Sequence, residues 1–164
     1  YDAWHANQAE IAATAYHQAI KADDVVTALA AAGDDLTAGY QMLSSFYSAA
    51  ALAAKKDFAA AEAAYLALAE NAKISPLYQQ AALLLSVMNA PDDRDLASLR
   101  DRLAGLEGAA GPWQAMALEQ AAGLALRAGD RKTALAKYEA LAGFAEIPAD
   151  MRQRASRMVE ILKG

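Results

Sequence analysis

The chain has 164 residues, 56% of them hydrophobic, which is long enough for one domain with a substantial core. Its 15 lysines and arginines are outnumbered by 20 aspartates and glutamates, giving a net charge of -5. A nucleic-acid binder needs a basic stripe to displace counterions from phosphates, so this balance argues against nucleic acid and against electrostatic binding to a membrane surface.

Apolar residues recur at intervals of three and four positions with almost no strand-like alternation, which predicts an all-α protein. Alanine favours helices and lets them approach closely, so tightly packed helix pairs are expected. In chain order we expect helices at about residues 2–32, 39–55, 58–73, 76–89, 93–107, 113–128, 131–143 and 148–163. The first is a long N-terminal helix, and its apolar face is expected to be covered by the segment that follows.

The breaks between these helices combine stop and start signals. Ser75 precedes Pro76 as a helix N-cap, and Gly129 offers the left-handed conformation that ends a helix. Paired aspartates at 34–35 and 92–93 are expected to cap helix starts. The pair Asp23–Asp24 falls inside the first predicted helix, where it marks either a solvated face or an unrecognised break.

An internal repeat is visible, because Pro76, Pro112 and Pro148 are 36 residues apart. The second helices also align at an offset of 73: Lys56, Asp57, Ala61 and Tyr65 match Gly129, Asp130, Ala134 and Tyr138. The alanine permits close helix approach and the tyrosine fills the gap beside it. These features predict one domain over residues 1–164, a tetratricopeptide-like right-handed stack of antiparallel helix pairs. Its repeats span about 39–75, 76–111 and 112–147, the middle one degenerate, with a polar capping helix at 148–163.

Residues that carry chemistry are sparse. The chain has no cysteine, and His5 and His17 are twelve positions apart, too far for a helical zinc site. The serines at 44, 45 and 48 have no histidine near them in sequence and are expected to be packing residues. We therefore expect no catalytic residue, no metal and no cofactor, and a hydrolase or transferase is disfavoured.

The remaining candidate site is a surface. Stacked helix pairs use the inner face, formed by the first helix of each pair, to hold peptides or other domains. By alignment of the repeats, this concave face would carry Leu43, Phe46, Gln80, Leu83, Met116, Glu119 and Arg127. The alternative is that several of these residues belong to the core.

Four segments together resemble a known family. They are Thr37–Tyr40, Gly111–Trp113, Glu119–Asp130 and Ile147–Ala155. The chain is similar, over nearly its whole length, to the tetratricopeptide-like domain of the ancillary subunit of the bacterial SecYEG translocon, of the alphaproteobacterial type. It departs from that family at Lys55–Asp57, where glycine and aspartate are usual.

The resemblance implies a periplasmic domain of a single-pass inner-membrane protein, with an N-terminal anchor upstream of Tyr1. It implies protein partners, namely translocon subunits, periplasmic chaperones or exported chains, and no catalytic residues. An alternative hypothesis is that the chain has the same fold but is a periplasmic adaptor or scaffold for envelope or cell-wall assembly.

Overall fold

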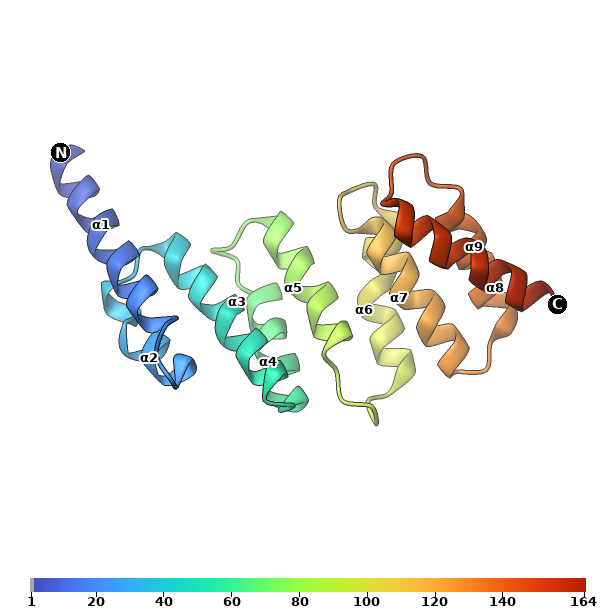
Figure 1. The fold of residues 1–164 in the computed structure, drawn as a ribbon, viewed down its shortest axis with the longest axis horizontal. Helices are drawn as coiled ribbons and strands as arrows, with labels where there is room; N and C mark the ends of the chain where they lie inside the picture. Colours follow the sequence, from blue (N-terminus) through green and yellow to red (C-terminus); the bar gives the residue numbers. More distant parts are fainter. Residues whose placement is uncertain (1) are drawn as a thin grey trace. The chain divides into compact units, whose positions relative to one another are not determined.

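The computed structural model describes residues 2–164, apart from the side chains of residues 2, 3, 5 and 34. Over this range the chain forms nine α-helices, one short 3-10 helix and no strand, which confirms the all-α prediction (Figure 1). The α-helices are α1 (Asp2–Ala19), α2 (Val25–Ala31), α3 (Ala38–Ala54), α4 (Phe58–Ala69), α5 (Pro76–Met88), α6 (Leu96–Gly108), α7 (Gln114–Arg127), α8 (Arg131–Ala142) and α9 (Ala149–Lys163). The 3-10 helix η1 (Gly33–Asp35) follows α2.

The chain divides into two compact units. Unit 1 comprises Tyr1–Ala82 and Asn89–Pro91, and unit 2 comprises Leu83–Met88 and Asp92–Gly164. Unit 1 therefore contains α1 to α4 with the first half of α5, and unit 2 contains the second half of α5 with α6 to α9. A single repeat domain over residues 1–164 stays a prediction.

The long helix predicted at 2–32 is wrong, because the chain breaks between Ala19 and Val25. Asp24 is the N-cap of α2: its carboxylate accepts from the Thr27 backbone N–H at 3.4 Å and from the Thr27 hydroxyl at 2.8 Å. These bonds lower the pKa of Asp24 below its ordinary value. Aspartate caps helix starts and β-branched residues are weak helix formers, so this point favours a new helix over continuation of α1.

The turns that join α3 to α4 and α7 to α8 have the same geometry. Lys56 and Gly129 both adopt the left-handed conformation, with φ of 64° and 75°. In each turn the following aspartate donates its backbone N–H to a carbonyl in the last helical turn, Asp57 to Leu52 and Asp130 to Ala125. This pattern closes the C-terminus of the helix and reverses the chain. Lys56 thus takes the conformation that glycine occupies in the second turn.

Both aspartates then cap the next helix. The Asp57 carboxylate accepts from the Ala60 backbone N–H at 3.2 Å, and the Asp130 carboxylate accepts from Thr133 at 3.0 Å. Three linking residues in each turn therefore end one helix and begin its antiparallel partner. The helix pairs α3–α4 and α7–α8 follow from these local signals, and Figure 1 shows the two helices of each pair side by side.

Alanines form the contact between the paired helices. In unit 1, Ala49 and Ala61 are fully buried, and in unit 2 Ala122, Ala125 and Ala134 are fully buried. The aromatic residues one helical turn after these alanines are buried as well: Tyr65 is 3% exposed and Tyr138 is 7% exposed. Desolvation raises the pKa of both tyrosines.

Helix α6, the second helix of the predicted middle repeat, follows a different turn and has a different core face. Its turn, residues 89–95, is longer than the two three-residue turns, and Asp95 caps α6 by accepting from the Ser98 backbone N–H at 2.8 Å. Asp92 and Asp93, which were expected to cap this helix, precede the cap. Leu99 and Leu103 are buried and are four positions apart, as Ala61 and Tyr65 are in α4 and Ala134 and Tyr138 are in α8. The core face of α6 is therefore apolar but contains no aromatic residue at this position.

Helix α9 covers unit 2 at its C-terminal end. Met151, Ala155 and Leu162 face the core that α7 and α8 form, while Gln153, Arg154, Arg157 and Glu160 are exposed. The predicted polar outer face of the last helix is confirmed.

At the other end of the chain, α1 contacts α2, η1 and α3, and the Tyr16 and Tyr40 rings lie 5.4 Å apart. The expected intramolecular cover of the N-terminal helix is partial: Ala12 and Ala19 are buried, whereas Ile11 is 42% exposed.

The left-handed Lys56 generates a prediction on stability. An L-residue in this conformation costs about 1–2 kcal/mol, whereas glycine adopts it freely but loses more chain entropy on folding. Lys56→Gly should therefore increase the free energy of unfolding by about 0.5–1 kcal/mol, measured by urea unfolding followed by circular dichroism.

The matched control is Gly129→Ala in the equivalent turn. A Cβ added at Gly129 meets nothing within 4 Å, so its cost is backbone strain alone and should be about 1 kcal/mol. A Lys56→Gly protein that is less stable than wild type would contradict the equivalence of the two turns.

Candidate functional site

The concave-face residues predicted in unit 1 are not core residues. Leu43 on α3 is 44% exposed, and Phe46 and Gln80 are half-buried. The Phe46 ring lies 6.3 Å from the buried Tyr65 ring and 6.5 Å from the ring of Tyr78, which is 43% exposed. Phe46 therefore joins the core to an aromatic surface at the start of α5.

The predicted residues of unit 2 are mostly engaged within the chain. Arg154 of α9 holds both carboxylate oxygens of Glu119, with Nε–Oε1 and Nη2–Oε2 distances of 2.9 and 3.2 Å. Arg127 donates to the Asp92 carbonyl at 2.9 Å. Met116 packs against the unit 2 core, and Leu83 is half-buried. Glu119 and Arg127 thus support the packing of their own unit, a use that the repeat alignment did not anticipate.

Arg154 also contacts the first turn of its own helix. It donates to Asp150 at 2.7 Å, an i to i+4 pair. The Asp150 carboxyl has a pKa below its ordinary value of 3.8, first because of this hydrogen bond from Arg154. The two carboxylates in turn raise the pKa of the Arg154 guanidinium.

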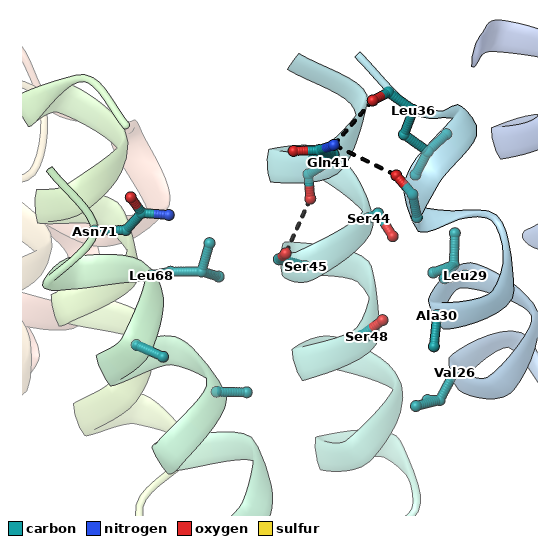
Figure 2. A pocket seen from close by; sticks show the side chains of 13 residues that line it. Val26, Leu29, Ala30, Leu36, Gln41, Ser44, Ser45, Ser48, Leu68 and Asn71 are labelled. Atoms are coloured by element: carbon teal, nitrogen blue, oxygen red, sulfur yellow. Dashed lines mark hydrogen bonds between the residues drawn. The ribbon is translucent and has the colours of Figure 1, made fainter. Parts of the chain in front are cut away.

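Unit 1 contains an open pocket of about 560 Å³ between α2, α3 and α4. Helix α3 supplies its floor with Gln41, Ser44, Ser45 and Ser48, at positions that follow one face of a helix. The walls are apolar. Helix α2 and the segment around η1 form one wall and α4 forms the other, with Val26, Leu29, Ala30, Gly33 and Leu36 on the first and Ala64, Ala67 and Leu68 on the second. The polar Asn71, which follows α4, also lines the pocket. Figure 2 shows α3 between the other two elements.

A second pocket of about 370 Å³ lies further toward the N-terminus of α3. It is lined by the first turns of α3 and α5 and by Lys73 and Ile74 of the α4–α5 loop. The two pockets share Gln41, Ser45 and Asn71, so they adjoin along α3. We call the lining of both pockets the α3 furrow.

Hydrogen bonds inside the chain fix the orientation of the shared polar residues. The Gln41 amide nitrogen donates to the Leu36 carbonyl at 2.9 Å and to the Gly33 carbonyl at 3.3 Å. The Ser45 hydroxyl donates to the Gln41 carbonyl at 2.9 Å, and the Asn71 side-chain oxygen accepts from the Lys73 backbone N–H at 3.0 Å. In Figure 2 the Gln41 oxygen is turned toward the α4 side and the Asn71 nitrogen toward the α3 side.

The serines at 44, 45 and 48 were expected to be simple packing residues, and instead they line this furrow. The signal that could have found them is their spacing, which places 41, 44, 45 and 48 on one face of α3. The missing information was the position of α2, because Asp23 and Asp24 alone do not decide between a solvated face and a helix break.

Metal-ligand groups and membrane-spanning helices can be assessed in the part of the chain that the structure describes. There, no three histidine, cysteine, aspartate or glutamate side chains come together as metal ligands. His17 is exposed beside Tyr16, with ring centroids 5.9 Å apart, while the His5 side chain and Tyr1 lie outside the described residues. Among the described helices none is long and apolar enough to span a membrane.

Comparison with family models, with curated proteins and with solved structures finds no match to this chain. The candidate site therefore has to be argued from its own residues.

The pairing of Arg154 with Asp150 predicts a change in titration. Arg154→Met should raise the pKa of Asp150 toward 3.8, because the hydrogen bond that stabilises its ionised form is removed. In the wild-type protein, ionised Asp150 stabilises the fold. This contribution is complete above the ordinary pKa of the carboxyl group and is lost as the pH falls through its lower pKa in the folded protein. The pKa of Asp150 is measured by NMR from its carboxyl ¹³C chemical shift between about pH 6 and about pH 2.

Arg157→Met is the control, since Arg157 is an exposed arginine of the same helix. It should leave the pKa of Asp150 unchanged. If both variants shift the pKa of Asp150 equally, the effect comes from net charge rather than from the Arg154 contact.

Proposed function

We propose that this chain is a non-enzymatic protein-binding module built as a tetratricopeptide-like stack of helix pairs. The repeated turns and the buried pairs Ala61/Tyr65 and Ala134/Tyr138 support the stacking. Tetratricopeptide-like repeats use their helical surfaces to hold segments of other proteins.

The observation that carries the binding role is the apolar surface of unit 1. Leu43, Tyr47 and Tyr78 are each between 40 and 44% exposed, although all three are large apolar or aromatic side chains. Leu43 and Tyr47 are four positions apart on α3, so they are neighbours on one face. Exposed aromatic and aliphatic side chains in such clusters mark surfaces that a partner covers.

The resemblance to the SecYEG ancillary subunit supports a more specific role. In this proposal the chain is the periplasmic part of an anchored inner-membrane protein. It would bind exported chains as they leave the translocon and pass them to periplasmic chaperones. A role in envelope or cell-wall assembly predicts different partners for the same fold.

The test is affinity purification of the full-length protein from gently solubilised native membranes, followed by mass spectrometry. We expect translocon subunits or periplasmic chaperones in the eluate. Leu43→Asp should reduce their recovery by roughly tenfold, because a charge in the centre of an apolar contact costs at least about 1.4 kcal/mol.

Ile161→Asp is the matched control, since Ile161 is an exposed aliphatic residue (59%) on the capping helix. It should leave the recovery unchanged. Recovery of cell-wall or envelope-assembly proteins in place of translocon subunits would overturn the translocon role and leave protein binding in place.

A further inference from the structure

The α3 furrow shares Tyr78 with the exposed apolar surface that carries the proposed function, whereas Leu43 and Tyr47 lie outside it. It follows α3 from Ala38 to Ser48, and ten residues of helix correspond to roughly 15 Å. An extended chain rises about 3.3 Å per residue, so a segment of about four or five residues fits this length.

Ser44 adds a hydroxyl to the floor of the larger pocket. The residue is 8% exposed, and among the described residues no buried side-chain nitrogen or oxygen lacks a hydrogen-bond partner. Figure 2 shows the Ser44 oxygen on the side of α3 that faces α2. A hydroxyl at this position can donate to or accept from a polar group of an occupant.

Both pockets are lined by one side-chain acceptor and one side-chain donor, from Gln41 and Asn71. The Gln41 nitrogen is occupied by two backbone carbonyls, which leaves its oxygen as an acceptor toward the furrow. The Asn71 oxygen is occupied by the Lys73 backbone, which leaves its amide nitrogen as a donor. Together they complement the N–H and C=O of a peptide backbone, whereas a fatty acyl chain has no group to offer them.

The two ends of the furrow differ in character. The larger pocket has apolar walls that include Leu29 and Leu68, which suit an aliphatic side chain. The smaller pocket contains Lys73, the only charged residue among the described residues that line the two pockets. Lys73 therefore favours an anionic group at that end.

We infer that the α3 furrow binds an extended peptide segment of a partner protein, with an aliphatic side chain in the larger pocket and a carboxylate beside Lys73. Alternate residues of an extended chain project to the same face about 7 Å apart, so the two side chains are two positions apart, as in Leu-x-Asp. The Gln41 oxygen and the Asn71 nitrogen bind the intervening backbone. This inference rests on the proposed function only in that the chain binds proteins.

The experiment measures fluorescence anisotropy of a fluorescein-labelled Ala-Ala-Leu-Ala-Asp-Ala amide titrated with the chain. We expect saturable binding. Replacing the peptide leucine by glycine or its aspartate by asparagine should weaken binding by roughly fivefold or more. The same weakening is expected from Lys73→Glu, and it should disappear when the asparagine peptide is the probe.

Filling the larger pocket is the second arm. Ser48→Leu should weaken binding of the leucine peptide by roughly tenfold, because the added side chain occupies the space that the peptide leucine needs. The matched controls are Lys21→Glu, an exposed lysine of unit 1, and Ser156→Leu, an exposed serine of α9. Both should bind as wild type does, and circular dichroism checks that every variant is folded.

Three results overturn the inference: no binding at millimolar concentration of the chain, equal effects of the furrow and control variants, or displacement of the bound peptide by decanoate with decanoate binding more tightly. The proposed function is tested separately in the membrane purification. If Ser48→Leu and Lys73→Glu retain the partners that Leu43→Asp loses, the peptide site is wrong and the binding role stands.

Discussion

Close contact between alanine faces is the constraint on which both units depend. Ala49 and Ala61 in unit 1 and Ala122, Ala125 and Ala134 in unit 2 are fully buried, and any larger side chain there would force the helices apart. Alanine buries little apolar area, so these contacts position the helices more than they stabilise them. The larger contributions come from the leucines and tyrosines beside them, which reach the core only because the helix axes lie close.

Charged contacts act mainly on the orientation of the last helix. Lys163 pairs with Glu139 at 2.6 Å, Arg131 donates to the Ile161 carbonyl at 2.9 Å, and Arg154 holds Glu119. Most of these side chains are exposed, so each pair stabilises the fold only slightly. Their joint effect is to fix α9 on both α7 and α8, and Glu119 of the predicted concave face takes part in this contact.

The helix boundaries could be predicted from the sequence because glycine, proline and aspartate mark them locally. Seven of the eight predicted helices correspond to observed ones within about one turn. The break before Val25 was missed because alanines on both sides favour continuing the helix, and the opposing signal is a single capping aspartate. The pairing of Glu119 with Arg154, 35 positions apart, and the lining of the furrow depend on tertiary contacts that no local pattern encodes.

That missed break is also what makes the furrow possible. If residues 2–32 formed one straight helix, Val26, Leu29 and Ala30 would continue away from Ala12 along its axis. Since the chain turns at residues 20–24, α2 is a separate helix that packs against α3 and supplies one wall of the furrow. The hydrogen bonds of Thr27 keep the Asp24 carboxyl ionised at lower pH than usual, because they lower its pKa. Asp24, for which the sequence leaves both a solvated face and a helix break open, therefore begins the helix that supplies one wall of the candidate site.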